Sequence, residues 1–109
     1  MAGRVDEKIL GLVRWVKDFL VARYGNRIRQ VILYGSCARG EQTEHSDVDI
    51  LVIVDDSLKP FKVRDALGDL IVDILLEEDK LLSVMVLTEK EFEREIPVRV
   101  NVEKEGVLI

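Results

Sequence analysis

The sequence predicts an α/β domain in which helices pack on a small mixed sheet. Short segments rich in Val, Ile and Leu alternate with longer segments whose apolar residues recur at helical spacing. Thirty-nine of the 109 residues are Val, Ile or Leu, which is enough for a packed core and argues against a disordered chain. The length is typical of one domain, so we expect a single domain over residues 1–109.

The first predicted elements are a helix over residues 4–24 and a strand over residues 28–34. In the helix, apolar residues recur every three or four positions, and Trp15 and Phe19 lie on or near this stripe as core or interface residues. Gly25 fits the positive-φ residue that ends many helices. The stripe consists of Val5, Ile9, Leu12, Val13, Val16 and Leu20.

A second strand is predicted over residues 47–54, after a brief helix over residues 36–42. Apolar side chains fall on both faces of this strand, so we expect a central strand that is covered on both sides. Asp47 and Asp49 at its start conflict with that burial, and such a local conflict often marks a functional site.

The C-terminal half is predicted to contain a turn over residues 55–60, a helix over 61–78 and a strand over 81–87. Thr88 and Glu91 form a capping-box pattern that opens a short helix, which Pro97 interrupts. The tail that follows is either a last helical turn or an edge strand. The predicted order is therefore helix and strand in alternation, beginning with a helix.

Composition excludes several classes of protein. The net charge of −5 is a poor match for wrapping nucleic acid, which needs clustered Lys and Arg, so no direct nucleic-acid binding is expected. Cys37 and His45 are the single cysteine and histidine, so no intrachain disulfide and no Cys/His zinc site is expected. His45 is read as a solvated loop residue. With no signal-peptide pattern and no long apolar stretch, we expect a soluble, cytoplasmic protein without membrane contact.

The segment YGSCARGE, followed by SDVD, carries the predicted chemistry. Gly35 permits a sharp turn and the close approach of a ligand, while Ser36 offers a hydroxyl and a backbone N–H to a phosphate. Asp47 and Asp49 stand at positions i and i+2 of a strand, so their carboxylates project the same way. Paired carboxylates suit Mg²⁺, which also binds phosphate oxygens. Together these features predict a magnesium–nucleotide site for attack on phosphorus.

This pattern resembles the G-S-x10-D-x-D signature of the DNA polymerase β-like nucleotidyltransferase superfamily. The run GSCARGEQTEHSDVDILVIV is similar in particular to the minimal nucleotidyltransferases of bacteria and archaea. The resemblance implies that Gly35 and Ser36 hold the triphosphate of ATP or another nucleotide and that Asp47 and Asp49 bind Mg²⁺. It also implies transfer of a nucleoside monophosphate, usually AMP, and an antitoxin role beside a HEPN-type protein partner; a homodimer is a further expected assembly.

The superfamily commonly places a third carboxylate on the next core strand, as a metal ligand or as a base. Here the neutral Ser83 falls at the expected position. Asp79 lies on the same strand face only if the strand extends that far, and Asp73 is relevant only if its segment is a strand rather than a helix. Two alternatives therefore stand beside an active protein-modifying enzyme: a non-catalytic, nucleotide-binding antitoxin or interaction module, and a free-standing enzyme for a small hydroxylated molecule, which the short chain disfavours.

Four residues around the motif have open roles. Arg39 either pairs with Asp47 or Glu41 or binds phosphate. Ser46 either contacts phosphate as part of the nucleotide site or only holds its loop. Tyr34 packs or forms a hydrogen bond at the end of its strand. Cys37 occupies a position that the signature leaves free, so we interpret it as a bystander.

Overall fold

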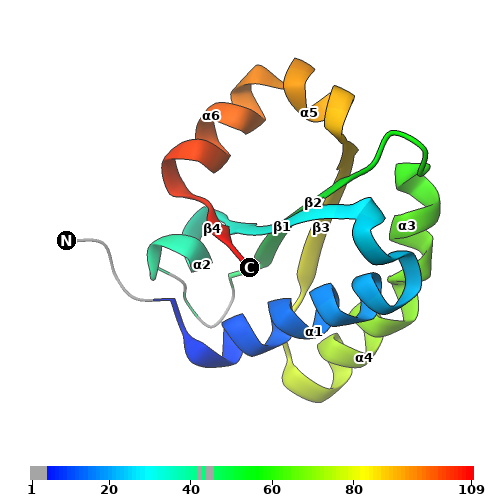
Figure 1. Ribbon diagram of the computed structural model, residues 1–109. Coiled ribbons are helices and arrows are strands. Elements are labelled where there is room, and N and C mark those ends of the chain that lie inside the picture. Colours follow the sequence, from blue (N-terminus) through cyan, green and yellow to red (C-terminus); the bar gives the residue numbers. More distant parts are fainter. Residues whose placement is uncertain (1–4, 42, 44–45) are drawn as a thin grey trace.

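The computed structural model describes residues 5–41, 43 and 46–109 (Figure 1). Helices and strands alternate as predicted through the second strand, after which two helices precede the third strand and two more precede the fourth. A four-stranded mixed sheet has the order β3-β2-β1-β4; β2 runs parallel to β3, whereas β1 is antiparallel to both β2 and β4. The elements are α1 (Glu7–Tyr24), a 3₁₀ turn (Gly25–Arg27), β1 (Ile28–Tyr34), α2 (Gly35–Arg39), β2 (Val48–Val54), α3 (Pro60–Ala66), α4 (Gly68–Glu78), β3 (Leu82–Thr88), α5 (Glu89–Arg94), α6 (Ile96–Glu105) and β4 (Val107–Leu108).

Helices cover both faces of the sheet, as predicted for a central second strand. α1, α3 and α4 lie on one face, and α5 and α6 arch over the other (Figure 1). Strand β2 sends alternate residues to the two sides: Val48 and Ile50 enter the larger core, whereas Leu51 and Ile53 enter a smaller one. Asp49 stands two residues before Leu51, so its side chain lies on the same side of the sheet as the smaller core.

Helix α1 confirms the predicted apolar stripe. Every member of the stripe is buried except Val5, which packs partly against the core. The helix begins at Glu7 because the Asp6 carboxylate accepts a hydrogen bond from the Lys8 amide at 2.7 Å. It ends at Tyr24, and the cap residue Gly25 has a φ of 60°, with the predicted positive sign. Arg4, the first residue of the predicted helix, lies outside the described residues.

The single helix predicted over residues 61–78 is wrong. The chain forms two helices, α3 and α4, which meet at Leu67. The Leu67 amide donates to the carbonyl oxygen of Arg64 at 3.0 Å, three residues back, which tightens the chain into a turn. Gly68, a weak helix former, then opens α4. Leu67 is fully buried, so the turn keeps both helices packed on the core and leaves the apolar stripe uninterrupted.

The tail contains both of the elements that its sequence left open. Pro97 lies in the first turn of α6, where its missing N–H is tolerated, and thereby separates α5 from α6. After Gly106, strand β4 pairs with β1. The predicted capping box is confirmed: Thr88 and Glu91 exchange hydrogen bonds of 3.1 and 3.0 Å at the start of α5. The third strand spans Leu82–Thr88, one residue later than predicted.

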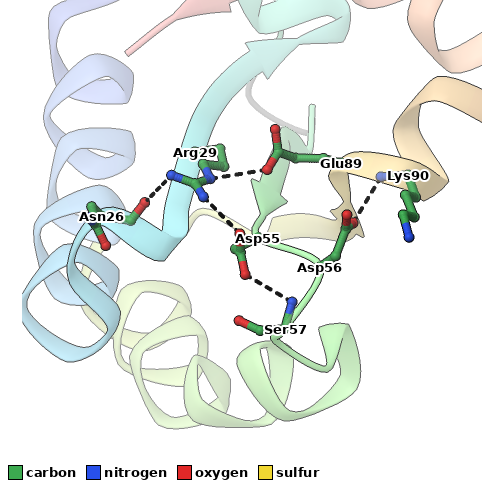
Figure 2. Close-up of polar contacts among 7 residues, drawn as sticks. All are labelled: Asn26, Arg29, Asp55, Asp56, Ser57, Glu89 and Lys90. Carbon is green, nitrogen blue, oxygen red and sulfur yellow. Dashed lines mark hydrogen bonds and ion pairs between the residues drawn. The ribbon is translucent and has the colours of Figure 1, made fainter.

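A polar network ties the start of α5 to the sheet (Figure 2). The Arg29 guanidinium on β1 forms ion pairs with Asp55 at 2.7 Å and Glu89 at 3.1 Å. Asp56 accepts a hydrogen bond from the Lys90 amide at 3.1 Å. The network thereby connects the loop after β2 with the helix that follows β3.

None of the helices in the described part of the chain combines the length and apolarity that a membrane span requires.

Candidate functional site

Three strand ends bring the predicted chemical residues together at one edge of the sheet. Tyr34, the last residue of β1, pairs with Asp49 near the start of β2. Asp49 in turn pairs with Ser83 near the start of β3. Asp47 directly precedes β2, and Gly35 directly follows β1. The fold thus places Gly35 and both aspartates at one end of two neighbouring strands.

Gly35 and Asp49 are in close contact. Gly35 has a φ of 75°, and a Cβ added there would lie 2.5 Å from the Asp49 Oδ2 atom. Glycine is therefore needed both for the backbone conformation and for the space that the carboxylate occupies. The sequence suggested that the missing Cβ makes room for a ligand; in the structure it makes room for Asp49.

At this edge of the sheet, burial and the neighbouring Asp47 carboxylate both oppose ionisation of Asp49. Burial raises the pKa of the half-buried Asp49 carboxyl, and the negative charge of Asp47 raises it further. A cation placed against both groups reverses the second effect. Carboxylate oxygens are also the hard donors that Mg²⁺ prefers, so these residues fit a magnesium ion.

Among the described residues, no three His, Cys, Asp or Glu side chains lie close enough together to hold a metal ion. Asp47 and Asp49 therefore have no third protein ligand of these types beside them. Ser83, the residue predicted at this position, is exposed and lies beside Asp49 in the parallel pair. Asp79 is the left-handed cap of α4 and precedes the first residue of β3, and Asp73 lies within α4. The helix expected around Asp73 is therefore confirmed, and β3 does not extend back to Asp79, so neither aspartate lies on the strand beside Asp49.

The short helix α2 starts at Gly35, one residue before the prediction, and ends at Arg39; Gln42, the end of the predicted helix, lies outside the described residues. Ser36 is partly exposed, and its carbonyl oxygen accepts a hydrogen bond from the Glu41 amide at 2.9 Å. This hydrogen bond, together with Gly40 at a φ of 71°, closes the C-terminal end of α2.

Arg39 serves as an ion-pair residue in this structure. Its guanidinium pairs with Glu41 at 3.1 Å and with Glu105 at 2.6 Å, and these contacts raise its pKa. The second pair fastens α2 to the end of α6. Of the two partners expected from the sequence, Asp47 and Glu41, the structure pairs Arg39 with Glu41. Nothing in the sequence indicated Glu105, which lies far along the chain.

The other residues around the motif have mainly local contacts. The Ser46 hydroxyl accepts a hydrogen bond from the Thr43 amide at 2.9 Å, which supports its loop-holding role. Cys37 is buried with its Sγ 3.5 Å from the Asp47 carbonyl oxygen, and burial is the main cause that raises its pKa. Tyr34 packs against the smaller core, and burial followed by the Asp49 charge raises its pKa. His45 lies outside the described residues.

Curated proteins of similar sequence include two relatives from one archaeon. The chain is 36% identical over 84 residues to "Putative protein adenylyltransferase MJ0604" of Methanocaldococcus jannaschii, an alignment that covers 74% of this chain and 78% of the relative. It is 38% identical over 76 residues to "Putative protein adenylyltransferase MJ0128" of the same organism, covering 64% of this chain and 76% of the relative.

Solved structures share the fold. A "putative nucleotidyltransferase" from Sulfolobus solfataricus superposes with a TM-score of 0.63 at 22% identity, covering 93% of this chain and 78% of that one. A toxin–antitoxin structure with AMP-PNP gives a TM-score of 0.55 at 20% identity, covering 85% of this chain and 68% of that one. The model of the nucleotidyltransferase domain family matches residues 13–109. The chain therefore belongs to the nucleotidyltransferase domain family, as its G-S and D-x-D motifs indicated.

Proposed function

We propose that this protein is a Mg²⁺-dependent nucleotidyltransferase that moves AMP from ATP to a hydroxyl group of a partner protein. The observation that carries the proposal is the pair of neighbouring carboxylates at one sheet edge, where Asp49 lies against Gly35 and feels the charge of Asp47. The curated relatives, named as protein adenylyltransferases, support AMP and a protein acceptor. A toxin–antitoxin structure with AMP-PNP among the fold neighbours supports an antitoxin role, and we propose a HEPN-type partner in the cytoplasm.

Each residue of the motif has a role in this proposal. Asp47 and Asp49 hold Mg²⁺, and Gly35 and Ser36 bind the β- and γ-phosphates and orient the triphosphate for attack at the α-phosphorus. When bound, Mg²⁺ neutralises phosphate charge and makes the attacking hydroxyl more acidic. In this proposal the hydroxyl oxygen bonds to the α-phosphorus as the bond to pyrophosphate breaks, and the hydroxyl proton would pass to a free carboxylate oxygen of Asp49. Ser46 contributes to the nucleotide site by holding the loop that precedes Asp47.

A second function is favoured by Ser83. This neutral, exposed residue lies beside Asp49, at a place where a carboxylate would add a metal ligand or a base. A serine hydroxyl is a weak base and a weak magnesium ligand compared with a carboxylate. The second candidate is therefore a non-catalytic antitoxin or interaction module that binds Mg²⁺ and nucleotide without transferring it.

Label transfer separates the two candidates. Lysate of the source cells is supplied with ATP labelled at the α-phosphate, Mg²⁺ and either the wild-type protein or the double variant Asp47→Asn/Asp49→Asn. The control variant Asp18→Asn/Asp65→Asn removes the same charge from exposed positions of α1 and α3. We expect a labelled protein band with the wild type and the control but not with the double variant.

The absence of a band has two readings that calorimetry of the purified protein distinguishes. Binding of ATP in the presence of Mg²⁺, lost in the double variant, would establish the binding module in place of the enzyme. Absence of both transfer and binding would contradict the proposed nucleotide site itself.

A further inference from the structure

Helix α4 exposes large apolar side chains on the face opposite the core. Leu70 and Ile74 are buried under the helix, whereas Val72 and Leu76 have exposed fractions of 52% and 77%. These two residues are four positions apart, so they lie one above the other on the same face. At 100° per residue, that face points away from Leu70 and Ile74. The folded chain therefore does not use either side chain for its own core.

The exposed apolar surface continues toward α1. A hollow of about 280 Å³ is lined by Ile9 and Leu12 of α1 and Glu78 of α4, so the Leu12 side of α1 faces α4. Trp15 lies three residues after Leu12 on this side and is 43% exposed, and Leu75 on α4 is 40% exposed. We call the surface formed by Val72, Leu75 and Leu76 the α4 face; Trp15 lies on the side of α1 that faces α4. Contiguous apolar surfaces of this kind mark sites of protein association.

Charge within helix α4 is of a single sign, whereas Lys8 and Lys80 line the neighbouring hollow. The α4 segment has acidic residues and no Lys or Arg, and the acidic Asp79 follows it. The acidic residues within the helix are Asp69, Asp73, Glu77 and Glu78. A second copy of this chain that docked through the same face would bring these carboxylates against one another, which is unfavourable. A surface with apolar residues flanked by Lys and Arg complements both the apolar centre and the acidic border.

The α4 face and the candidate nucleotide site lie on opposite sides of the sheet. Leu70 and Ile74 pack α4 against the larger core, whereas Asp49 lies on the side of the smaller core. The exposed Leu81 and then Ser83 lead from the end of α4 to the position beside Asp49. A protein bound to α4 would thus reach the edge of the site without covering the carboxylates.

We propose that the α4 face docks a basic, amphipathic helical surface of a partner protein, with Val72 and Leu76 as the central contacts. The inference rests on the proposed function only in assuming a protein partner, and it requires no nucleotide transfer. It also assigns separate surfaces to docking and chemistry: α4 holds the partner, and the edge with Asp47 and Asp49 carries the reaction.

The test uses the full chain, three synthetic peptides and the fluorescence of Trp15, the single tryptophan. The probes are a Leu/Lys peptide with Leu at helical spacing, a scrambled peptide of the same composition, and a Leu/Glu peptide with the same spacing. We expect saturable binding of the first peptide, weakened by added salt, and a change in Trp15 emission. The other two peptides should bind at least about tenfold more weakly, since each lacks one part of the complementarity.

The deciding variant is Val72→Ser/Leu76→Ser, which leaves the net charge unchanged. We expect it to weaken the Leu/Lys peptide by about tenfold or more, as the loss of central interface side chains does. The control is Phe61→Ser/Val100→Ser, which alters side chains of 62% and 54% exposure on α3 and α6 and should leave affinity unchanged. Circular dichroism confirms that both variants fold.

Three results would overturn the inference. One is equal binding of the helical and scrambled basic peptides, which would show charge attraction alone. Another is unchanged affinity in Val72→Ser/Leu76→Ser. The third is self-association of the wild type that this variant abolishes, which would assign the α4 face to a second copy of the chain. None of these measurements involves ATP, so failure here is distinguishable from failure of the label-transfer experiment.

Discussion

The Asp49 carboxylate fills the space in which a side chain at position 35 would begin: a Cβ on Gly35 would meet its Oδ2 atom at 2.5 Å. The two residues belong to the G-S and D-x-D halves of the motif and are brought together because Tyr34 and Asp49 are register partners in neighbouring strands. The two halves of the motif therefore meet in space, and the carboxylate of one half occupies the room that the glycine of the other half leaves.

Gly35→Ala tests this contact. We expect a loss of stability of about 1–3 kcal/mol from the positive φ, with a further loss because the Asp49 carboxylate must move. Gly25→Ala is the matched control: its φ is 60°, and nothing lies within 4 Å of the added Cβ. Urea denaturation measures both variants. Equal losses of stability, together with undiminished ATP binding in Gly35→Ala, would contradict the role of the contact.

Local sequence was enough to predict the elements around the site, because alternation and helical spacing are local properties. In the segment 47–54, the valines lie on the face of the larger core and the aspartates fall on the opposite face, as expected from the two-residue period of a strand. The turn at Leu67 was missed because it is buried and continues the apolar stripe, so periodicity alone does not reveal it. Gly68 was the one local signal of a break.

Long-range contacts could not be predicted in the same way. The direction of each strand pair depends on how the chain returns to the sheet, so the antiparallel pairing of β1 with β2 was not visible in either segment. The ion pair between Arg39 and Glu105 joins residues that 65 others separate. Glu105 looks like any charged residue near the end of a helix, and only the packing of α6 beside α2 gives it a partner.

The pKa of Asp49 is expected to respond to its neighbour. Asp47→Asn removes a negative charge, so the pKa of Asp49 should fall, yet stay above its usual value because burial is the larger cause. Carboxyl carbon NMR, recorded over a pH titration without divalent metal, measures the change. Asp18→Asn on α1 serves as the control for net charge. An unchanged pKa of Asp49 in Asp47→Asn would show that the two carboxylates do not interact.

Ser83→Asp should convert the carboxylate pair into a group of three. Because position 83 is the register partner of Asp49, the new carboxylate should bind the same cation, and we expect Mg²⁺ affinity to increase about tenfold. Without metal, the added charge should raise the pKa of Asp49 further. Calorimetry with Mg²⁺ and ATP gives the affinity, and label transfer shows whether activity rises as well.

Two controls accompany Ser83→Asp. Ser83→Asn changes the size of the side chain in a similar way without adding charge, and Met85→Asp adds the same charge two residues further along the same face of β3. Neither should increase Mg²⁺ affinity as Ser83→Asp does. An equal increase with Met85→Asp would mean that net charge, rather than position beside Asp49, determines metal binding.

Stability in acid should depend on Asp55 in the network of Figure 2. Hydrogen bonds from Ser57, together with Arg29, lower the pKa of Asp55 to about 2. Since this folded-state pKa lies below the unfolded value of about 3.9, the stabilisation is complete above that value and is lost as pH falls from about 4 to about 2. Asp55→Asn should therefore be less stable than the wild type at neutral pH, with a difference that shrinks toward pH 2. Urea denaturation across this range checks the prediction; Asp18→Asn controls for charge, and a difference that stays constant down to pH 2 would contradict it.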